Sequence, residues 1–286
     1  MAQALRGSGD DEPEAAQRPQ AGSDHGEPEA AQRPQAGISD SADVPLGGRT
    51  RAGDEQTTPR QSTGRARIPL LDRVRAHERT STFILAADEF LGAQGFTEHG
   101  SRHANLVGHI AFNVLTHLGH DSRTAELGAV AGYLHDIGNV VSRAHHGQTS
   151  AMLAYQLLLE LDVDARDIAE VISAVGNHEE EYGVAVSPVA AAVILADKSD
   201  VHRSRVRKDA SIEMDIHDRV NYAVQTSFLR VDPQARTLTL ELVIDTAISQ
   251  VLEYFEIFLE RMIMCRRAAV TLGCDFRITV NGVQVL

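Results

Sequence analysis

Six side chains of metal-binding type are spread along the central part of the chain, each at the edge of a predicted helix. In order they are His103, His135, Asp136, His146, His178 and Asp197. The adjacent pair His135-Asp136 closes an apolar run, and Gly138 follows as the expected stop of that helix. A buried helix end that carries an imidazole and a carboxylate must satisfy both groups, and a divalent cation satisfies both at once. The order H…HD…H…H…D therefore predicts a metal centre with ligands from five segments.

Such a centre predicts hydrolysis of a phosphate ester. A bound divalent ion lowers the pKa of its water to near neutral, and the resulting hydroxide can attack phosphorus in line. We expect hydrolysis of a phosphoester or phosphoanhydride in a small molecule, with a nucleotide as the expected substrate. Asp136 and Asp197 are the expected catalytic carboxylates. The ligand types are compatible with Mn, Fe, Mg or Co.

Neighbouring histidines leave alternatives open. His145 competes with His146, but the spacing favours His146 at the N-terminal entry of the next helix. His178 ends an apolar helix, where a histidine can instead act as a C-terminal cap favoured by the helix dipole. His99 or His109 could support the ligands or transfer protons without binding the metal.

The densest basic run in the chain, residues 198–208, begins directly after Asp197. Arginine binds phosphate oxygens in bidentate fashion, so Arg203 and Arg205, together with Lys198, are expected to neutralise the substrate phosphate. A solvated charged face is the alternative. Asp200 is expected either to form a salt bridge with this run or to assist the metal-bound water.

At these residues the chain resembles the HD-domain superfamily of metal-dependent phosphohydrolases, over roughly residues 75 to 210. His103, His135-Asp136 and Asp197 match the core pattern of the superfamily, and His146 and His178 match the positions typical of its two-metal members. The surrounding residues are most similar to the branch that includes bacterial dinucleoside-polyphosphate hydrolases of the YqeK type. The resemblance implies an all-α fold in which Asp136 bridges two ions.

Two other branches of the superfamily match less well. Cyclic-di-GMP phosphodiesterases of the HD-GYP group carry a lysine after HDxG and a GYP triplet, whereas Asn139 follows Gly138 here and the segment from His178 to Gly183 lacks the triplet. Alarmone hydrolases of the RelA/SpoT type have HDxxED, and residues 137–140 supply no such acids. The expected substrate is therefore an unassigned small phosphate ester.

Helices must position these ligands, and residues 67–210 show helical periodicity almost throughout. His103 shares one stripe with Leu106, Ile110 and Val114, which predicts that it lies on the buried face of its helix. Further helices are expected at 124–135, 148–161, 165–175 and 188–197, the last with proline in its first turn. We predict a mainly α protein with an all-helical metal-binding domain at 67–210.

The regions on either side differ from this domain. Residues 211–286 predict a small α+β module, with a hairpin around 232–235, a long helix at 247–272 and strands around the turn Asn281-Gly282. This module is a candidate homodimer interface. Residues 1–66 contain almost no large apolar side chains and repeat one proline-containing string, from Glu12 and again from Glu27. We expect a disordered low-complexity tail.

The composition limits the kinds of binding partner and the compartment that we expect. A formal net charge of −13 argues against binding to nucleic acid, which depends on clustered Lys and Arg. The apolar runs are far shorter than the roughly 20 residues of a membrane span, so we expect no membrane partner. Cys265 and Cys274 are too few for a disulfide framework, which favours the reducing cytoplasm.

Two other functions remain open from the sequence. Relatives with the same six ligands include di-iron oxygenases, which cleave carbon bonds with O₂. A non-catalytic, metal-stabilised sensor is the other alternative, with the C-terminal module mediating dimerisation or regulation.

Overall fold

The computed structural model describes residues 69–207 and 216–286, which belong to one compact unit, Ser62–Leu286. The predicted tail at 1–66 and the predicted boundaries at 67 and 211 lie outside the described residues, so this division of the chain stays a prediction. Within the described ranges the chain is mainly helical and ends in a small sheet. The predicted fold class is confirmed.

The helices predicted from the sequence agree with the described ones to within a few residues at most ends, whereas the short helix at 216–223 was not predicted. The described helices are α1 (Leu70–Ala76), α2 (Glu78–Ala93), α3 (Ser101–His117), α4 (Ser122–Leu134), α5 (His146–Glu160), α6 (Ala165–Gly176), α7 (Pro188–Lys198), α8 (Ile216–Ala223) and α9 (Val251–Thr271). Two short 3₁₀ helices are η1 (Ile137–Val140) and η2 (Arg203–Arg205). Among the described helices, none combines the length and the hydrophobicity needed to cross a membrane.

Helix α7 lies at the centre of the helical part. Its residues from Val189 to Ala196 are apolar on every side and all of them are buried. A helix that is apolar all round must be covered on every face, and α7 packs against α3, α4, α6 and α9. Ser187 caps it by accepting from the backbone N–H of Ala190. The helix therefore carries Asp197, in its last turn, into the interior.

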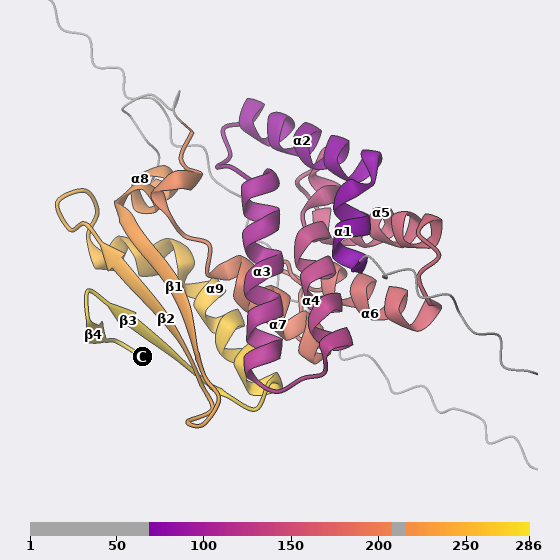
Figure 1. The fold of residues 1–286 in the computed structure, drawn as a ribbon. Helices are drawn as coiled ribbons and strands as arrows, with labels where there is room; N and C mark the ends of the chain where they lie inside the picture. The colour runs from indigo at the N-terminus through magenta and orange to yellow at the C-terminus, as the bar shows by residue number, and fades with distance from the viewer. Residues whose placement is uncertain (1–68, 208–215) are drawn as a thin grey trace, which may run out of the picture. The chain divides into compact units, whose positions relative to one another are not determined.

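Helices α3 and α4 lie side by side at very short range (Figure 1). A Cβ atom on Gly108 would lie 2.8 Å from the carbonyl oxygen of Ala129, and one on Gly132 would lie 2.9 Å from Cα of Gly108. Both distances are shorter than any normal Cβ contact, so glycine is required at this crossing. The close approach sets His103, near the start of α3, beside His135, directly after α4.

Gly138 has a different role from the predicted one. Helix α4 already ends at Leu134 with His135 as its C-cap, and Gly138 lies inside η1. A Cβ atom on Gly138 would lie 2.4 Å from both the carbonyl oxygen of His146 and the backbone nitrogen of Ser150. Gly138 therefore does not stop the helix. Its missing side chain lets α5 approach the end of α4, which brings His146 towards Asp136.

The C-terminal part is a four-stranded sheet in the order β1-β2-β3-β4. The strands are β1 (Val224–Asp232), β2 (Thr237–Ile244), β3 (Asp275–Val280) and β4 (Val283–Gln284). Strands β1 and β2 form the predicted hairpin, β3 is parallel to β2, and β4 returns antiparallel to β3. Helix α9 connects β2 to β3 and packs against both β3 and α7 (Figure 1). The sheet is therefore joined to the helical part through α9.

Candidate metal centre

The six predicted ligands meet in the interior, from the five segments that the sequence predicts. His103 lies in the first turn of α3, His135 and Asp136 follow α4, His146 begins α5, His178 follows α6, and Asp197 lies in the last turn of α7. The four imidazoles and Asp136 are buried, and the side chain of Asp197 is 12% exposed. The ligand set is therefore largely removed from water.

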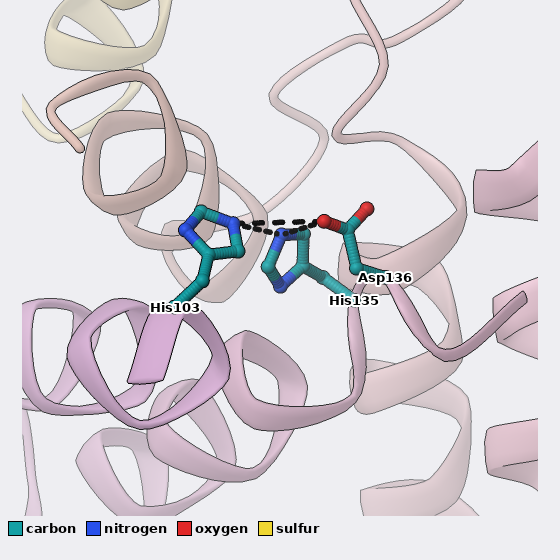
Figure 2. A group of neighbouring side chains, drawn as sticks. All are labelled: His103, His135 and Asp136. Carbon is teal, nitrogen blue, oxygen red and sulfur yellow. Dashed lines mark hydrogen bonds and ion pairs between the residues drawn. The ribbon is translucent and has the colours of Figure 1, made fainter. Parts of the chain in front are cut away.

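The first half-site consists of His103, His135, Oδ2 of Asp136 and Oδ1 of Asp197. The Nε2 atoms of His103 and His135 are 3.1 Å apart. Asp136 Oδ2 lies 3.5 Å from the first and 3.3 Å from the second, and Asp197 Oδ1 lies 3.3 and 3.6 Å from them. Figure 2 shows the two rings and the Asp136 carboxylate directed towards one point.

The second half-site consists of His146, His178 and the other oxygen of Asp136. The Nε2 atoms of His146 and His178 are 3.0 Å apart, and Asp136 Oδ1 lies 3.1 and 3.6 Å from them. Asn139 donates from Nδ2 to the same oxygen at 3.0 Å. Asp136 thus offers one carboxylate oxygen to each half-site, which is the arrangement that a bridging ligand requires.

The outer nitrogen of each imidazole faces an oxygen acceptor. The acceptors are Asp200 Oδ2 for His103 (2.7 Å), Gly132 O for His135 (2.7 Å), Arg143 O for His146 (3.0 Å) and Val175 O for His178 (2.7 Å). Carbonyl and ionised carboxylate oxygens only accept hydrogen bonds, so Nδ1 carries the hydrogen in each ring. Every Nε2 lone pair is therefore directed inward.

This donor set fits divalent metal ions. Four inward Nε2 lone pairs and the oxygens of two carboxylates are all acceptors, so they cannot satisfy one another by hydrogen bonding. Their ligand atoms form groups of three, and within each group the atoms lie within 4.8 Å of one another. Asp136 belongs to two of these groups. Buried acceptors gathered in this way need a cation between them. Imidazole and carboxylate are ligands that Mn, Fe, Co and Zn accept.

A proton can balance part of this charge when no metal is bound. Burial lowers the pKa of His135, but the carboxylates of Asp136 and Asp197 outweigh it and raise this pKa to about 10. Burial raises the pKa of Asp136, yet the surrounding imidazoles hold it well below its usual range. Burial also lowers the pKa of His178, which keeps that ring neutral. The first half-site therefore needs a positive charge, from a proton or from a metal.

A protein-family model described as the HD domain matches residues 100–201, a span that contains all six ligands. Residues 100–201 form an HD domain. The predicted resemblance is thus confirmed, and HD domains belong to a superfamily of metal-dependent phosphohydrolases that bind divalent metals. A comparison with curated proteins finds no match for this chain.

Near the end of the HD domain, Asp200 lies behind His103. Its side chain is 1% exposed and lies 2.9 Å from Arg102 Nη2 and 3.9 Å from Arg205 Nη1. Burial raises the pKa of Asp200, but His103, Arg205 and Arg102 hold it well below its usual range. The ionised carboxylate makes the expected salt bridge to the basic run and fixes the His103 ring. An acceptor behind a metal-binding histidine orients it and raises its basicity.

The three basic residues that were predicted to contact phosphate occupy three different environments in and beside the HD domain. Lys198 is buried, with Nζ 2.7 Å from Asp197 Oδ2 and 3.0 Å from Glu180 Oε1. Arg205 is buried and donates to the backbone oxygens of Glu98 and Asp200. Arg203 lies with its guanidinium 5.5 Å from the centre of the Tyr222 ring. Lys198 thus supports a ligand, and the predicted contacts of these side chains with substrate phosphate stay predictions.

The sequence pattern did not point to Arg143, a residue of the HD domain beside the ligands. Its Nη1 donates to Asn139 Oδ1 at 3.3 Å and lies 3.5 Å from His146 Nε2. Its guanidinium also lies 5.6 Å from the centre of the Phe96 ring. Among the described residues no carboxylate oxygen lies within 4.0 Å of it, so its charge has no anionic partner there. The one cue in the sequence is its place three residues before His146.

Three other histidines of this region do not join the ligand set. His145 is exposed and its ring packs 5.1 Å from that of Tyr182, so His146, and not His145, lies among the ligands. His109 is exposed on α3. His99 lies just before the HD domain, with its ring centroid 5.5 Å from that of His103. His99 therefore packs beside the first half-site without joining the ligand set.

Proposed function

We propose that this protein hydrolyses a phosphoester or phosphoanhydride bond in a small molecule, of the nucleotide class, in a metal-dependent reaction. The observation that carries the proposal is the acceptor set of the HD domain, in which Asp136 presents one oxygen to each of two histidine pairs. An arrangement with two adjacent cation positions suits attack of water on phosphorus. When bound, divalent ions supply Lewis acidity and lower the pKa of a coordinated water.

The side chains around the ligands have separate tasks in this proposal. The Nδ1 contacts hold the four imidazoles in the tautomer that binds a metal. Lys198 neutralises the outer oxygen of Asp197 at 2.7 Å and keeps the other oxygen facing inward. Asn139 instead donates to Asp136 Oδ1, the oxygen that faces the second half-site, and so fixes the orientation of that carboxylate. These contacts preorganise the centre, so little rearrangement is needed when substrate binds.

Arg143 is the side chain that we assign to the substrate phosphate. It is half-buried beside His146 and carries a charge without a carboxylate partner among the described residues. A guanidinium binds phosphate oxygens with two parallel hydrogen bonds and stays charged at any working pH. It would replace Arg203 in the predicted role, because Arg203 packs on Tyr222.

Two further observations support a nucleotide as the substrate class. Phe96 is 39% exposed and lines a cavity of about 340 Å³ together with Arg143, Arg205 and Arg261, which gives an aromatic surface close to cationic groups. Bases stack on exposed aromatic rings, and phosphates bind arginine. The sequence resemblance to dinucleoside-polyphosphate hydrolases points in the same direction.

A substrate panel with defined metals tests the proposal. The purified chain, loaded in turn with Mn²⁺, Fe²⁺, Mg²⁺ or Co²⁺, should release phosphate from at least one nucleotide or phosphoester. Asp136→Ala should lose both metal content and turnover, by at least about 10³-fold, because both half-sites share this carboxylate. Asp72→Ala, which changes a carboxylate that is 55% exposed on α1, serves as the matched control and should keep both.

The same experiment separates the alternatives. Oxygen consumption by the iron-loaded protein, without phosphate release, would identify a di-iron oxygenase. A metal-replete chain that acts on no member of the panel would favour the non-catalytic sensor. An Asp136→Ala variant that keeps full metal content and activity would refute the assignment of the centre itself.

A further inference from the structure

Three arginines from separate parts of the chain line one cavity of about 340 Å³. Arg143 precedes α5, Arg205 lies in η2 and Arg261 lies in α9. The whole chain has a formal net charge of −13, so its average composition does not account for three guanidinium groups around one cavity. Within the described lining, Asp218 supplies the carboxylate. The cavity is therefore a local basic site in an acidic protein.

Each guanidinium is fixed by some of its nitrogens and keeps another for a ligand. Arg143 uses Nη1 on Asn139, Arg205 uses Nε and Nη1 on backbone oxygens, and Arg261 places Nε 2.8 Å from Glu180 Oε1. Within the described part of the chain, the Nη2 atoms of these three side chains have no protein acceptor. An anion in the cavity would thus meet oriented donors whose positions are already set.

The cavity adjoins the metal ligands. His99, part of its lining, packs edge-on against His103, and Arg143 lies 3.5 Å from Nε2 of His146. Arg205 donates to the backbone oxygen of Asp200, the residue whose carboxylate holds His103. A molecule whose phosphate reaches the metal centre can therefore extend into this cavity.

One wall of the cavity comes from the C-terminal part of the chain. Asn221 of α8 and Phe258 and Arg261 of α9 belong to the lining. Phe258 is buried, and the guanidinium of Arg261 lies 4.7 Å from the centre of its ring. Because α9 packs firmly against α7, which carries Asp197, Arg261 has a fixed place relative to the ligands. The C-terminal module thus contributes directly to the surroundings of the metal centre.

We infer that this cavity binds a second anionic group, a phosphate or a carboxylate, of the same small molecule whose phosphoryl group reacts, and that Arg261 selects for it. The inference rests on the proposed function for the identity of the reacting group. A substrate with one anionic group leaves the free donors of Arg205 and Arg261 to water, whereas a second anion gains charge-assisted hydrogen bonds from them. The C-terminal module then determines which phosphate compounds bind well.

Binding of non-hydrolysable phosphonates tests the inference apart from turnover. The full chain, saturated with Mn²⁺, is titrated calorimetrically with two matched pairs that differ by a methyl or a carboxylate: ethylphosphonate with phosphonoacetate, and propylphosphonate with 3-phosphonopropionate. In at least one pair the carboxylate member should bind about tenfold more tightly or better. Arg261→Met should reduce that preference to less than about threefold.

Two variants control for other effects of the substitution. Arg267→Met changes an exposed arginine on the same helix and should keep the full preference, as well as any contribution from chelation of Mn²⁺. Arg261→Lys keeps a cation near Glu180 but removes the fork of donors, and should give an intermediate preference. Thermal unfolding of each variant shows that the fold is retained, and if Arg261→Met does not fold, Arg261→Lys decides.

The outcomes separate this inference from the proposed function. No preference for either carboxylate member in the unmodified chain overturns the second-anion site. A preference that Arg261→Met leaves unchanged overturns the role of Arg261. A preference that Arg261→Met removes, in a protein that hydrolyses nothing on the panel, supports the site while the proposed function fails.

Discussion

The two half-sites of the metal centre are held by different kinds of structure. His103, His135 and Asp197 are attached to α3, α4 and α7, which pack against one another in the core. His146 and His178 instead lie at the start of α5 and after the end of α6, and His145, directly before the first of them, has a positive φ of 56°. The first half-site depends on helix packing, and the second depends on the conformation of short connecting segments.

The first half-site also has more ligands than the second, and more charged side chains contact those ligands from behind. The first half-site has two imidazoles and two carboxylates, and Asp200 and Lys198 support it from behind with charged contacts. The second half-site has two imidazoles and one shared carboxylate, with Glu179 2.5 Å from Nδ1 of His146. More ligands on a more rigid frame bind a metal more tightly. We therefore expect the first half-site to fill first and to release its ion last.

The largest expected effect comes from removing one imidazole from each half-site in turn. If two ions bind as we propose, His135→Ala should lower the metal content to at most one ion per chain and abolish the proposed hydrolysis, because the tighter position is lost. His146→Ala should keep one firmly bound ion and still lose most activity. Metal analysis after gel filtration, with His109→Ala as a control on an exposed position of α3, gives the stoichiometries. Equal metal contents in the two variants would contradict the proposed inequality of the half-sites.

A smaller effect should follow from changing the groups behind the ligands. Asp200→Asn keeps an oxygen for the Nδ1 hydrogen of His103 but removes a charge that Arg102 and Arg205 both contact. Glu179→Gln makes the matched change behind His146. Such substitutions typically weaken metal binding by roughly 10–100-fold. Competition with a fluorescent chelator should show a loss of about that size for Asp200→Asn, at the more tightly held ion only.

The second of these variants provides the comparison. Glu179→Gln should weaken only the more loosely held ion, since the backbone oxygen of Arg143 remains as an acceptor for His146. The loss should also be smaller than for Asp200→Asn. A variant at Glu179 that releases the tightly held ion would show that the two half-sites are not independent.

The smallest expected effect is a dependence of stability on pH that belongs to the first half-site. The pKa of His135 is raised from 6.5 to about 10 in the folded, metal-free protein, so its protonated form stabilises the fold. This contribution is fully present below pH 6.5 and is lost as the pH rises through about 10. Metal-free protein should therefore lose a few degrees of Tm between pH 7 and 10 beyond what the metal-loaded protein loses.

Two variants locate this dependence. His135→Gln, measured without metal, should remove the additional fall in Tm, because it has no ring to protonate. His178→Gln should keep it, because burial lowers the pKa of His178 and that ring is already neutral at pH 7. A fall in Tm that persists in His135→Gln and disappears in His178→Gln would show that the proton is bound in the second half-site, which contradicts the prediction.

The sequence by itself predicted the candidate ligands and determined the class of fold. Helical periodicity and glycine or proline at the helix ends are local properties, because backbone hydrogen bonds in a helix join residues four apart. They predicted most helices, the buried face that carries His103, and the six metal-binding side chains at the edges of five segments. The choice of His146 over His145 also followed from spacing alone.

Only the tertiary structure decided how those side chains are combined. The division into two half-sites depends on the close crossing of α3 and α4 at Gly108 and Gly132 and on the contact of Gly138 with α5. Such approaches join segments far apart in the chain and depend on how side chains fill space, which no periodicity records. For the same reason the sequence did not show that Lys198 supports Asp197, that Arg143 faces His146, or that Arg261 reaches the cavity beside them.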